Sequence, residues 1–472
     1  MMQVEDRSPG ARCREFRQQG GVAGGARLCQ GACLPHESRQ LTQPLRIGLA
    51  GLGTVGAGVV RLLEANAALV ARRAGRPIAI TAVSARDRAR KRGIDHARFP
   101  WVDDATALAA RSDVDVVVEL VGGADGPALT LARAALGAGK PLVTANKAMV
   151  AHHGLALAEL AEATGTPFKF EAAVAGGIPV IKGLREGAAA NALSAVSGIL
   201  NGTCNYILTR MEQDGMEFGA VLADAQALGL AEADPGFDID GVDAAHKVSI
   251  LASLAFGTRP DFASVAIAGI RPVRLADIRQ AAQLGYRVRL VGLAALGDDG
   301  LLQQVAPCLV PLGHPLAAVE GPLNAVLAEG NFVGRLFFMG AGAGAGPTAS
   351  AVVADLIDIA RGEAGPAFAM PVGELEAVGA ADPARRHLRH YIRLQVADRP
   401  GVLADVAAAL RDHAVSIESL IQPRANEDRP ALLVIVTHDG PEGAVRAALA
   451  DIARLEAVLE APLMMPILGD EE

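Results

Sequence analysis

The amino-acid sequence predicts an α/β protein with a doubly wound parallel sheet, an α+β region and a C-terminal ferredoxin-like domain. The first observation is a glycine-rich turn after a short apolar run, followed by alternating strand and helix patterns to about residue 172. The second is a β-α-β-β-α-β order after residue 388. The third is the length of 472 residues, which at about 150 residues per domain suggests roughly three domains.

Composition limits the class of protein. Hydrophobic residues make up 51% of the chain and aromatic residues only 3%, so the expected core is aliphatic. A net charge of -8 argues against a nucleic-acid or anionic-membrane partner. No stretch of about 18 residues lacks charge, so we expect no membrane span. Three of the five cysteines lie in the first 33 residues, which indicates reduced thiols and a cytoplasmic protein.

The first 44 residues differ from the rest of the chain. They are rich in Arg, Gly and Gln and lack apolar periodicity, and no apolar core of a secretory signal follows their charges. We therefore expect a disordered extension over 1–44, with order beginning at Leu45.

A glycine motif follows the first predicted strand, Leu45–Ala50, and precedes a helical pattern. This context is the one that dinucleotide binding requires. The first glycine permits a tight turn, the second lets the backbone approach a pyrophosphate, and the third allows close helix packing. Free amides at the helix start attract phosphate. We favour this interpretation over an ordinary tight turn, and the expected cofactor-binding residues are Gly51, Gly53, Thr54, Val55 and Gly56.

Further strands and helices alternate along the same region, which predicts the parallel sheet. The expected strands are Ile78–Val83, Val114–Glu119, Pro141–Thr144 and Pro167–Phe170. The expected helices between them are Ala105–Ala110, Ala128–Leu136 and Leu155–Ala163.

Arg86 lies just past the second predicted strand. An arginine there accommodates the 2′-phosphate of NADP, whereas a carboxylate would bind the ribose 2′-hydroxyl of NAD. Arg86 therefore favours NADP, while Asp87 keeps NAD open as the alternative. A solvated surface charge is the plainer interpretation of such an arginine.

Two candidates follow at the carboxyl edge of the sheet, where ligands lie in open α/β folds. Lys147 comes just after the strand that ends at Thr144, and we expect it in a loop. Glu171 opens a glycine-containing turn that extends to Pro179. A carboxylate with backbone carbonyls nearby suits a hard cation such as Na⁺, although most such turns bind nothing.

The densest polar cluster extends from Glu232 to Leu251 and contains five carboxylates, Glu232, Asp234, Asp238, Asp240 and Asp243. We expect Asp240 or Asp243 to cap the helix that follows. Asp243 and Lys247 are four residues apart and share a helix face. Lys247 is a candidate proton-transfer group, and a structural capping carboxylate with a salt bridge is the alternative.

Two further segments are rich in small residues and are candidates for contact with a ligand. Cys204, in the segment Gly198–Tyr206, is either a thiolate nucleophile or, more commonly for such a residue, an inert buried thiol. A second glycine run, Gly340–Thr348, precedes the predicted helix Ala349–Ile359 and suits close approach by a ligand.

The C-terminal part is expected to fold as a separate unit behind a linker over 363–386. Its turn, Asp398 to Gly401, exposes amides at the start of the helix Val402–Asp412, which suits an amino-acid carboxylate. The remaining expected elements are strands at Tyr391–Ala397, Val415–Ile421, Ala431–Val436 and Val458–Met465 and a helix at Glu442–Leu455.

Six motifs in one order resemble the homoserine dehydrogenase family with a C-terminal ACT domain, over about residues 45–466. They begin at Gly51, Thr144, Asn201, Glu232, Asp243 and Pro347. The resemblance implies reversible, NAD(P)-dependent conversion of L-homoserine to L-aspartate 4-semialdehyde, in a homodimer or homotetramer with threonine as an effector at the ACT domain. It implies a Rossmann-type domain at 45–172, a substrate-binding and dimerisation domain at 173–340, a return segment at 341–365, a linker at 366–388 and the ACT domain at 389–466.

The resemblance also implies roles for single residues. Lys247 matches the proton-relay lysine, Lys147 the lysine that contacts cofactor and substrate, and Asp243 the acid beside the relay. The implied substrate-binding residues are Glu232, Thr203 and Asp238, and Gly344 matches a cofactor contact. The implied sodium turn comprises Glu171, Val174, Gly176 and Ile178. Two alternatives stay open: a semialdehyde dehydrogenase with Cys204 as nucleophile, and a non-catalytic amino-acid sensor.

Overall fold

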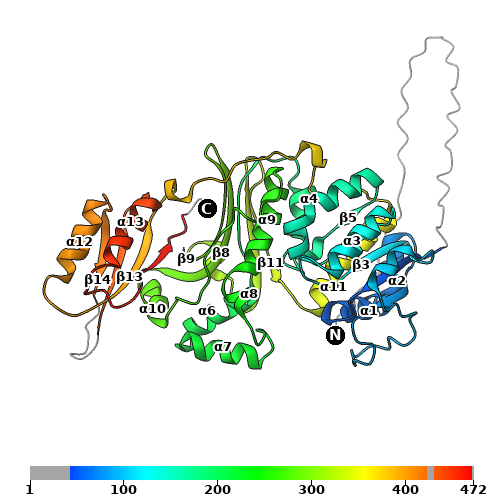
Figure 1. The fold of residues 1–472 in the computed structure, drawn as a ribbon, viewed down its shortest axis with the longest axis horizontal. Coiled ribbons are helices and arrows are strands. Elements are labelled where there is room, and N and C mark those ends of the chain that lie inside the picture. The colour runs from blue at the N-terminus through cyan, green and yellow to red at the C-terminus, as the bar shows by residue number, and fades with distance from the viewer. Residues whose placement is uncertain (1–42, 423–429, 470–472) are drawn as a thin grey trace, which may run out of the picture. The chain divides into compact units, whose positions relative to one another are not determined.

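The computed structural model describes residues 43–422 and 430–469, whose helices and strands are shown in Figure 1. The extension expected at 1–44 lies outside the described residues except for its last two.

The first sheet is parallel, in the order β2-β1-β3-β4-β5. Its strands are β1 (Leu45–Ala50), β2 (Ile78–Ser84), β3 (Val116–Glu119), β4 (Leu142–Thr144) and β5 (Phe168–Lys169). Val116 and Val118 face the core under α1 (Thr54–Ala65), whereas Val117 faces the core under α3 (Pro127–Gly137) and α4 (Lys147–Thr164). This alternation confirms the doubly wound sheet. Because the chain leaves β1 to one side and returns to β3 on the other, a crevice for ligands is expected at the ends of these two strands.

Two predicted helices differ from the structure. Residues Ala105–Ala110 form the 3₁₀ helix η1 rather than an α-helix. Helix α4 begins at Lys147, well before the expected Leu155, so Lys147 is the first helical residue and not part of a loop. The Asn146 side chain accepts a hydrogen bond from the Met149 amide at 3.1 Å, which caps this earlier start.

The second sheet has six strands in the order β11-β10-β6-β8-β9-β7, antiparallel except for the β7–β9 pair. They are β6 (Leu193–Ile199), β7 (Ala266–Ile267), β8 (Tyr286–Gly297), β9 (Gly300–Pro311), β10 (Leu323–Gly330) and β11 (Gly334–Ala341). The helices with this sheet are α6 (Gly202–Asp214), α7 (Phe218–Ala227), α8 (Gly236–Ile239), α9 (Val242–Phe256) and α10 (Leu275–Gln283).

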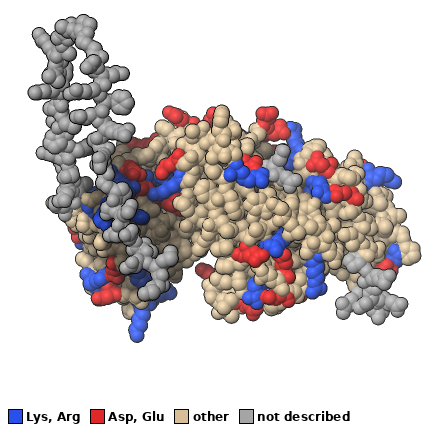
Figure 2. Space-filling view, turned by 180° about the vertical axis from the view of Figure 1, so that it is seen from behind, with Lys and Arg blue, Asp and Glu red and all other residues tan. Residues whose placement is uncertain are grey.

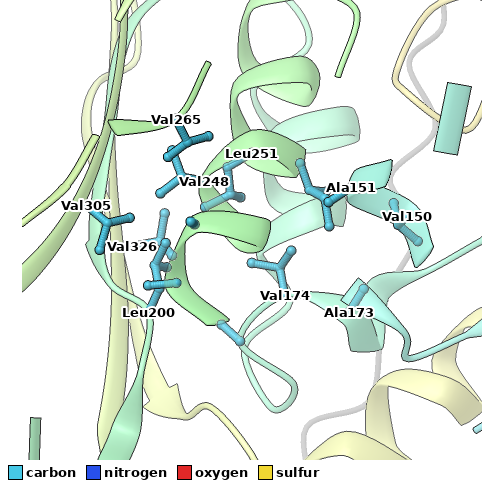
Figure 3. Close-up of a cluster of buried hydrophobic side chains, with 14 of the residues drawn as sticks. Val150, Ala151, Ala173, Val174, Leu200, Val248, Leu251, Val265, Val305 and Val326 are labelled. Carbon is cyan, nitrogen blue, oxygen red and sulfur yellow. The ribbon is translucent and has the colours of Figure 1, made fainter. Parts of the chain in front are cut away.

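Helix α9 lies between the second sheet and α4, and therefore joins the two sheets through one core (Figure 1). In Figure 3, Val248 and Leu251 of α9 lie between Val305 and Val326 of the sheet on one side and Ala151 of α4 on the other. The predicted apolar stripe on this helix is confirmed, because Val248, Leu251 and Leu254 are all buried.

The chain returns to the first sheet through α11 (Ala345–Arg361), which packs against α1. A Cβ atom on Gly58 of α1 would lie 2.3 Å from the Ala345 carbonyl oxygen, so only glycine permits this approach. The helix expected at Ala349–Ile359 is thus confirmed, and it begins earlier.

The C-terminal domain has the expected ferredoxin-like order. Its elements are β13 (His390–Val396), α12 (Val402–Asp412), β14 (Ile417–Ile421), β15 (Ala431–Thr437), α13 (Glu442–Ile452) and β17 (Leu463–Pro466). The four strands form an antiparallel sheet in the order β14-β15-β13-β17, and both helices pack on the face that carries Ile392 and Leu394.

The opposite face of this four-stranded sheet contacts α10, a helix that packs with the six-stranded sheet. Buried polar groups form this contact. Asp277 of α10 accepts hydrogen bonds from the Tyr391 hydroxyl at 2.9 Å and from the Arg393 guanidinium at 2.5 Å. All three side chains are buried. The C-terminal domain therefore has a hydrophobic core of its own and also shares a buried polar interface with α10, and its folding as a separate unit stays a prediction.

The expected linker is also structured. It contains two short 3₁₀ helices, η5 (Val372–Glu374) and η6 (Pro383–Arg385), and the strand β12 (His387–Leu388), which pairs with β16 (Gly440–Pro441). Single bridges join Thr258 to Glu376 and Leu301 to Ala380. Through these bridges the segment contacts the residues after α9 and the strand β9. The few apolar residues in its sequence do not predict these contacts.

Acidic and basic side chains are interspersed on the face that Figure 2 shows. Within the described ranges, no single helix has the length and hydropathy needed to cross a membrane. Helices α1 and α2 (Ala67–Ala74) reach the threshold only as a pair, and they are bent by 85° at the break between them.

Candidate active site

Two lysines from different domains meet on one buried carboxylate. Asp243, in the first turn of α9, has its Oδ2 atom 2.7 Å from Lys247 Nζ and its Oδ1 atom 3.0 Å from Lys147 Nζ. Lys247 is almost buried and also donates to the Leu200 carbonyl oxygen at 2.5 Å. The Lys147 side chain is more open, with 34% of its surface exposed. The predicted Asp243–Lys247 pair is therefore present, and it is part of a larger triad with Lys147.

The opposite charges in the triad stabilise the ionised forms of Asp243 and Lys147. Burial by itself would raise the pKa of Asp243, but the ammonium groups of Lys247 and Lys147 lower that pKa well below its usual range. Asp243 in turn raises the pKa of Lys147, and burial opposes this effect. Asp243 is thus ionised at neutral pH, and it holds a protonated Lys147 beside Lys247.

Neither predicted carboxylate caps α9. The N-cap residue is Gly241, with φ +88°, and its position lacks a side-chain cap. Asp240 instead pairs with Arg271, whose Nη2 atom is 2.9 Å away. Asp243 lies inside the first turn, where its oxygens are taken by the two lysines and by Asn201. Charge pairing therefore replaces the expected cap.

Asn201 was not among the predicted residues, although it organises this region. Its amide donates to Asp243 Oδ2 and to Asp238 Oδ1, each at 2.8 Å. Its side-chain oxygen accepts from the Cys204 amide at 2.8 Å and so caps α6. Two sequence signals were available: Asn201 opens one of the six motifs of the family resemblance, and an Asn directly before a helix ordinarily indicates a cap.

The three predicted substrate-binding residues differ in burial, and Asp238 is linked to the triad through Asn201. Asp238 is half-buried, and burial followed by the charge of Asp243 raises its pKa. Thr203 is half-buried in the first turn of α6, and its hydroxyl donates to the Leu230 carbonyl oxygen at 2.8 Å. Glu232 is exposed in the segment before α8. After the larger effect of Asp243, the charges of Asp238 and Glu232 also raise the pKa of Lys147.

Cys204 is a poor nucleophile in this structure. Its side chain is fully buried, and burial, followed by the charge of Asp238, raises the pKa of the thiol well above its usual value. The Sγ atom donates to the Asp238 carbonyl oxygen at 3.3 Å. These features argue against the thiolate mechanism.

The glycine turn after β1 has the predicted geometry at two positions. Gly51 has φ +96°, and a Cβ there would lie 2.4 Å from the Leu120 carbonyl oxygen after β3. A Cβ on Gly56 would lie 2.0 Å from the Gly51 carbonyl oxygen, so the third glycine packs helix α1 against the turn itself. Gly53 is exposed and faces open space, as an approach to a phosphate requires. Thr54 and Val55 form the first turn of α1.

Glu119 is a second residue that the sequence analysis missed. It is fully buried at the end of β3, and its Oε1 atom accepts from the amides of Val121 and Gly122 at 2.7 and 3.0 Å. Its Oε2 atom accepts from the Thr144 hydroxyl at 2.5 Å. One carboxylate therefore fixes the loops after β3 and β4, at the edge of the sheet where the glycine turn also lies. A carboxylate that ends an apolar strand was the available signal.

Arg86 is exposed just after β2, as the sequence predicts. The Asp87 carboxylate accepts from the Ala89 amide at 2.8 Å, in a local turn. Arg92 donates to the Leu52 carbonyl oxygen at 3.0 Å and so ties this basic segment to the glycine turn. Gly344, with φ +119°, is the N-cap residue of α11, whose first residue lies against α1.

The Glu171 turn is closely packed. The Glu171 carboxylate accepts from the amides of Ile181 and Lys182 at 3.1 and 2.8 Å. Burial and the nearby Asp355 raise the pKa of Glu171 to about 7. The Ile178 carbonyl oxygen accepts from the Val180 amide at 2.8 Å. Among the residues that the structure describes, no three His, Cys, Asp or Glu side chains are grouped as metal ligands.

A parallel sheet with a glycine turn at its switch point, next to a buried lysine–carboxylate–lysine triad, defines a nucleotide-dependent oxidoreductase. Three family models match this chain: "Homoserine dehydrogenase, NAD binding domain" over residues 51–171, "Homoserine dehydrogenase" over 179–357 and "ACT domain" over 390–456. The chain belongs to the homoserine dehydrogenase family.

Individual relatives agree with this assignment. A homoserine dehydrogenase of Neisseria gonorrhoeae is 44% identical over 429 residues, which cover 90% of this chain and 98% of that protein. The crystal structure of a homoserine dehydrogenase from Thiobacillus denitrificans has a TM-score of 0.85 at 40% identity and covers 90% of this chain and 99% of its own. A hyperthermophilic archaeal homoserine dehydrogenase in complex with NADPH has a TM-score of 0.57 at 25% identity, with 67% of this chain and 97% of that chain covered.

The protein is therefore an NAD(P)-dependent oxidoreductase that interconverts L-homoserine and L-aspartate 4-semialdehyde, with a C-terminal ACT domain. The predicted fold class and activity are confirmed, and both the semialdehyde dehydrogenase and the non-catalytic sensor are set aside.

Proposed function

We propose that the Lys147–Asp243–Lys247 triad is the catalytic centre of this homoserine dehydrogenase. When bound, the nicotinamide supplies the hydride acceptor for the alcohol and the hydride donor for the aldehyde. In homoserine oxidation the neutral amine of Lys247 accepts the proton of the terminal hydroxyl, and in aldehyde reduction its ammonium form donates that proton to the carbonyl oxygen. Lys147 contacts both substrate and cofactor. Asp243 holds the two ammonium groups near each other despite their repulsion. The observation that carries the proposal is that one buried carboxylate binds lysines from both domains.

Glu232, Thr203 and Asp238 are the residues we propose for substrate binding. Homoserine carries an ammonium group, and the exposed carboxylate of Glu232 gives it a counter-charge at the open side of the triad. Asp238 lies deeper and is linked to the triad through Asn201.

The proposed cofactor contacts are Gly51, Gly53, Thr54, Val55, Gly56, Arg86, Lys147 and Gly344. Two helices, α1 and α11, begin near one another here, and their free amides suit a pyrophosphate. NADP is the cofactor we propose, because Arg86 is exposed just after β2 whereas Asp87 is engaged in its own turn. The archaeal relative in complex with NADPH supports this choice.

Homoserine oxidation by the Arg86→Ala variant tests both the activity and the cofactor. We expect KM for NADP to rise by roughly 10- to 100-fold, as for a lost charge-assisted hydrogen bond of about 1.5–3 kcal/mol, while KM for NAD changes little. Steady-state assays with each cofactor measure this difference, and Arg90→Ala, an exposed arginine on the same segment, is the matched control. Equal losses with NAD and NADP would show that Arg86 is a general surface charge.

We also propose that the turn of Glu171, Val174, Gly176 and Ile178 binds Na⁺. Glu171 and Asp355 are two buried carboxylates beside each other, with pKa values raised to about 7 and about 6 because burial disfavours their charged forms. Backbone carbonyl oxygens with one carboxylate are the ligand type that a hard cation prefers. A cation here would allow Glu171 to ionise.

The sodium proposal predicts a pH-dependent stabilisation. The pKa of Glu171 is raised above its ordinary value of 4.5, so its contribution to stability is lost as the pH rises through about 7. Because Na⁺ favours the ionised form, sodium chloride should raise Tm more above about pH 7 than at about pH 5, relative to choline chloride at equal ionic strength. Differential scanning calorimetry of the native chain and of Glu171→Gln measures the effect. An equal response in that variant would exclude the site.

The ACT domain is proposed to bind threonine at the turn before α12. A cavity of about 320 Å³ is lined by residues 396–403 with Gln422, Ala431 and Leu433. Gly401, with φ +95°, is the N-cap residue of α12, so free amides of that helix face an incoming carboxylate. Threonine is the effector that the resemblance implies.

Gly401→Val should abolish this response, because a β-branched residue is strained at positive φ and would fill the turn. A threonine titration of the native chain should change apparent homoserine affinity by roughly 5- to 150-fold, and the variant should keep only basal activity. Gly440→Ala, at an open position in the same domain, is the control. Inhibition of both variants alike would place the effector elsewhere. A point substitution is preferable to removal of the domain, since Tyr391 and Arg393 are bonded to Asp277.

A homodimer or homotetramer is proposed from the surface of β11. This strand forms one edge of the second sheet, and its exposed apolar side chains include Phe337 and Met339, with Phe332 just before it at 89% exposure. A long apolar edge strand is a ready site for pairing with a second copy. We further propose a cytoplasmic location, which agrees with the two free, buried cysteines in the described part of the chain. The domain boundaries stated for the family resemblance are likewise part of this proposal.

A further inference from the structure

Four rings lie next to the triad, and the family resemblance assigns a role to none of them. They are His152 of α4, Phe237 of α8, His246 of α9 and Phe262 in the segment after α9, and we call them the ring cluster. The cluster joins both domains, because His152 belongs to the helix that begins with Lys147 while His246 follows Asp243 on α9.

The rings are held in a fixed order. His246 stacks on Phe262 with centroids 4.3 Å apart and planes 9° apart, and on Phe237 with centroids 5.5 Å apart and planes 25° apart. His152 meets His246 edge-on at 5.1 Å, and their Nε2 atoms are 3.1 Å apart. One imidazole must donate and the other accept at that distance.

The protonation of His246 fits this arrangement. Burial, and then the facing His152, lower the pKa of His246 to about 4. The other charged groups that act on it are Asp243 on its own helix and Lys147 on α4. At neutral pH His246 is therefore uncharged, and it provides an aromatic face rather than a second cation beside the triad.

Phe237 connects the ring cluster to Lys147. The Lys147 Nζ atom lies 5.7 Å from the centre of the Phe237 ring, within the range of a cation–π contact. The two lysines of the triad differ in how firmly they are held. Lys247 has two oxygen partners, Asp243 and the Leu200 carbonyl, and is nearly buried. Among the residues that the structure describes, Asp243 is the one ion-pair partner of Lys147, whose side chain is one-third exposed, so the Phe237 ring is its second contact.

We propose that Phe237, stacked on His246, is a positioning residue that holds the Lys147 ammonium in place for the reaction. This inference rests on the proposed role of Lys147. A long lysine side chain loses up to about 2 kcal/mol of rotamer freedom when it is fixed, so a contact that restricts it before substrate binds lowers that cost.

The test is a double-mutant cycle on homoserine oxidation at saturating cofactor. Phe237→Leu keeps apolar bulk but removes the ring, and should lower kcat by roughly 2- to 30-fold. Phe237→Tyr keeps the ring and should stay within about twofold of the native chain. In a Lys147→Met background, Phe237→Leu should have no further effect on kcat, because the two residues act as one unit.

Two further variants test the stack behind Phe237. His246→Phe preserves an aromatic face and should retain most activity, whereas His246→Leu should resemble Phe237→Leu. Leu228→Ala, which truncates an exposed apolar side chain in the same domain, is the control for surface changes. Calorimetry of every variant separates a loss of folding from a loss of positioning.

Three results would overturn the inference: normal kcat in Phe237→Leu, equal losses in the Leu and Tyr variants, or additive effects of Phe237→Leu and Lys147→Met. A different result would count against the proposed function itself. If Lys147→Met alone has nearly normal kcat, Lys147 has no catalytic role, and both the proposed centre and the positioning by Phe237 fail.

Discussion

Lys247→Ala should lower kcat for homoserine oxidation by roughly 10²- to 10⁴-fold, the usual contribution of a positioned acid–base group. The substitution removes the proton-transfer group and leaves Asp243 with Lys147 as its one ammonium partner. KM for the cofactor should barely change, because Lys247 lies on α9 rather than in the glycine turn. Steady-state kinetics over a range of NADP and homoserine concentrations measure both quantities.

The control for Lys247→Ala must separate the loss of the proton-transfer group from the loss of one buried positive charge. Lys182→Ala removes a lysine that pairs with Asp358 rather than with Asp243, and should retain activity if the protein folds normally. Thermal unfolding of both variants checks the fold. Near-normal turnover in a folded Lys247→Ala variant would contradict the catalytic assignment.

Asp277→Ala should destabilise the protein by about 3–5 kcal/mol, the cost of leaving a buried charge without its partner. Arg393 is buried, pairs with Asp277 and has Glu460 Oε1 at 3.6 Å as its remaining carboxylate neighbour. The variant also removes the acceptor of the buried Tyr391 hydroxyl. Urea unfolding measures the change in free energy.

Burial raises the pKa of Asp277 even beside Arg393, so desolvation of the carboxylate exceeds the attraction of the pair. The double variant Asp277→Leu with Arg393→Met should therefore recover much of the lost stability, since neither charge is then buried alone. Asp298→Ala, at an exposed position, is the control. A loss below about 1 kcal/mol in Asp277→Ala would show that the interface is hydrated and weak.

Local patterns predict much of this structure. Asp243 and Lys247 are one helical turn apart, so their pairing depends on helix geometry alone. The spacing of the glycine motif can also be recognised from neighbouring residues alone, although Gly51 meets Leu120, which follows the distant strand β3. The ferredoxin-like strands are recognised from their alternation, which reflects one buried face.

The features that the sequence does not predict depend on contacts between residues far apart in the chain. Asn201 reaches Asp243 across 42 positions, and Glu119 reaches Thr144 across 25, so neither role is visible in a local window. Lys147 and Asp243 were both expected at the site, but their meeting follows from the packing of α4 against α9. The prediction that Asp240 or Asp243 caps α9 is wrong for a related reason. The capping rule considers only the carboxylate and its own helix, whereas Lys147 binds Asp243 from α4.

The close contact of Gly58 with Ala345 has a consequence for how the chain is made. The nucleotide-binding half is not contiguous, because α11 at residues 345–361 completes the core that covers one face of its sheet. A ribosome delivers the first five strands and α1 early, yet this face stays only partly covered until the whole second sheet and α11 have been synthesised. Nascent chains that stop before Arg361 should therefore expose apolar surface and attract chaperones, whereas slightly longer chains can close the core.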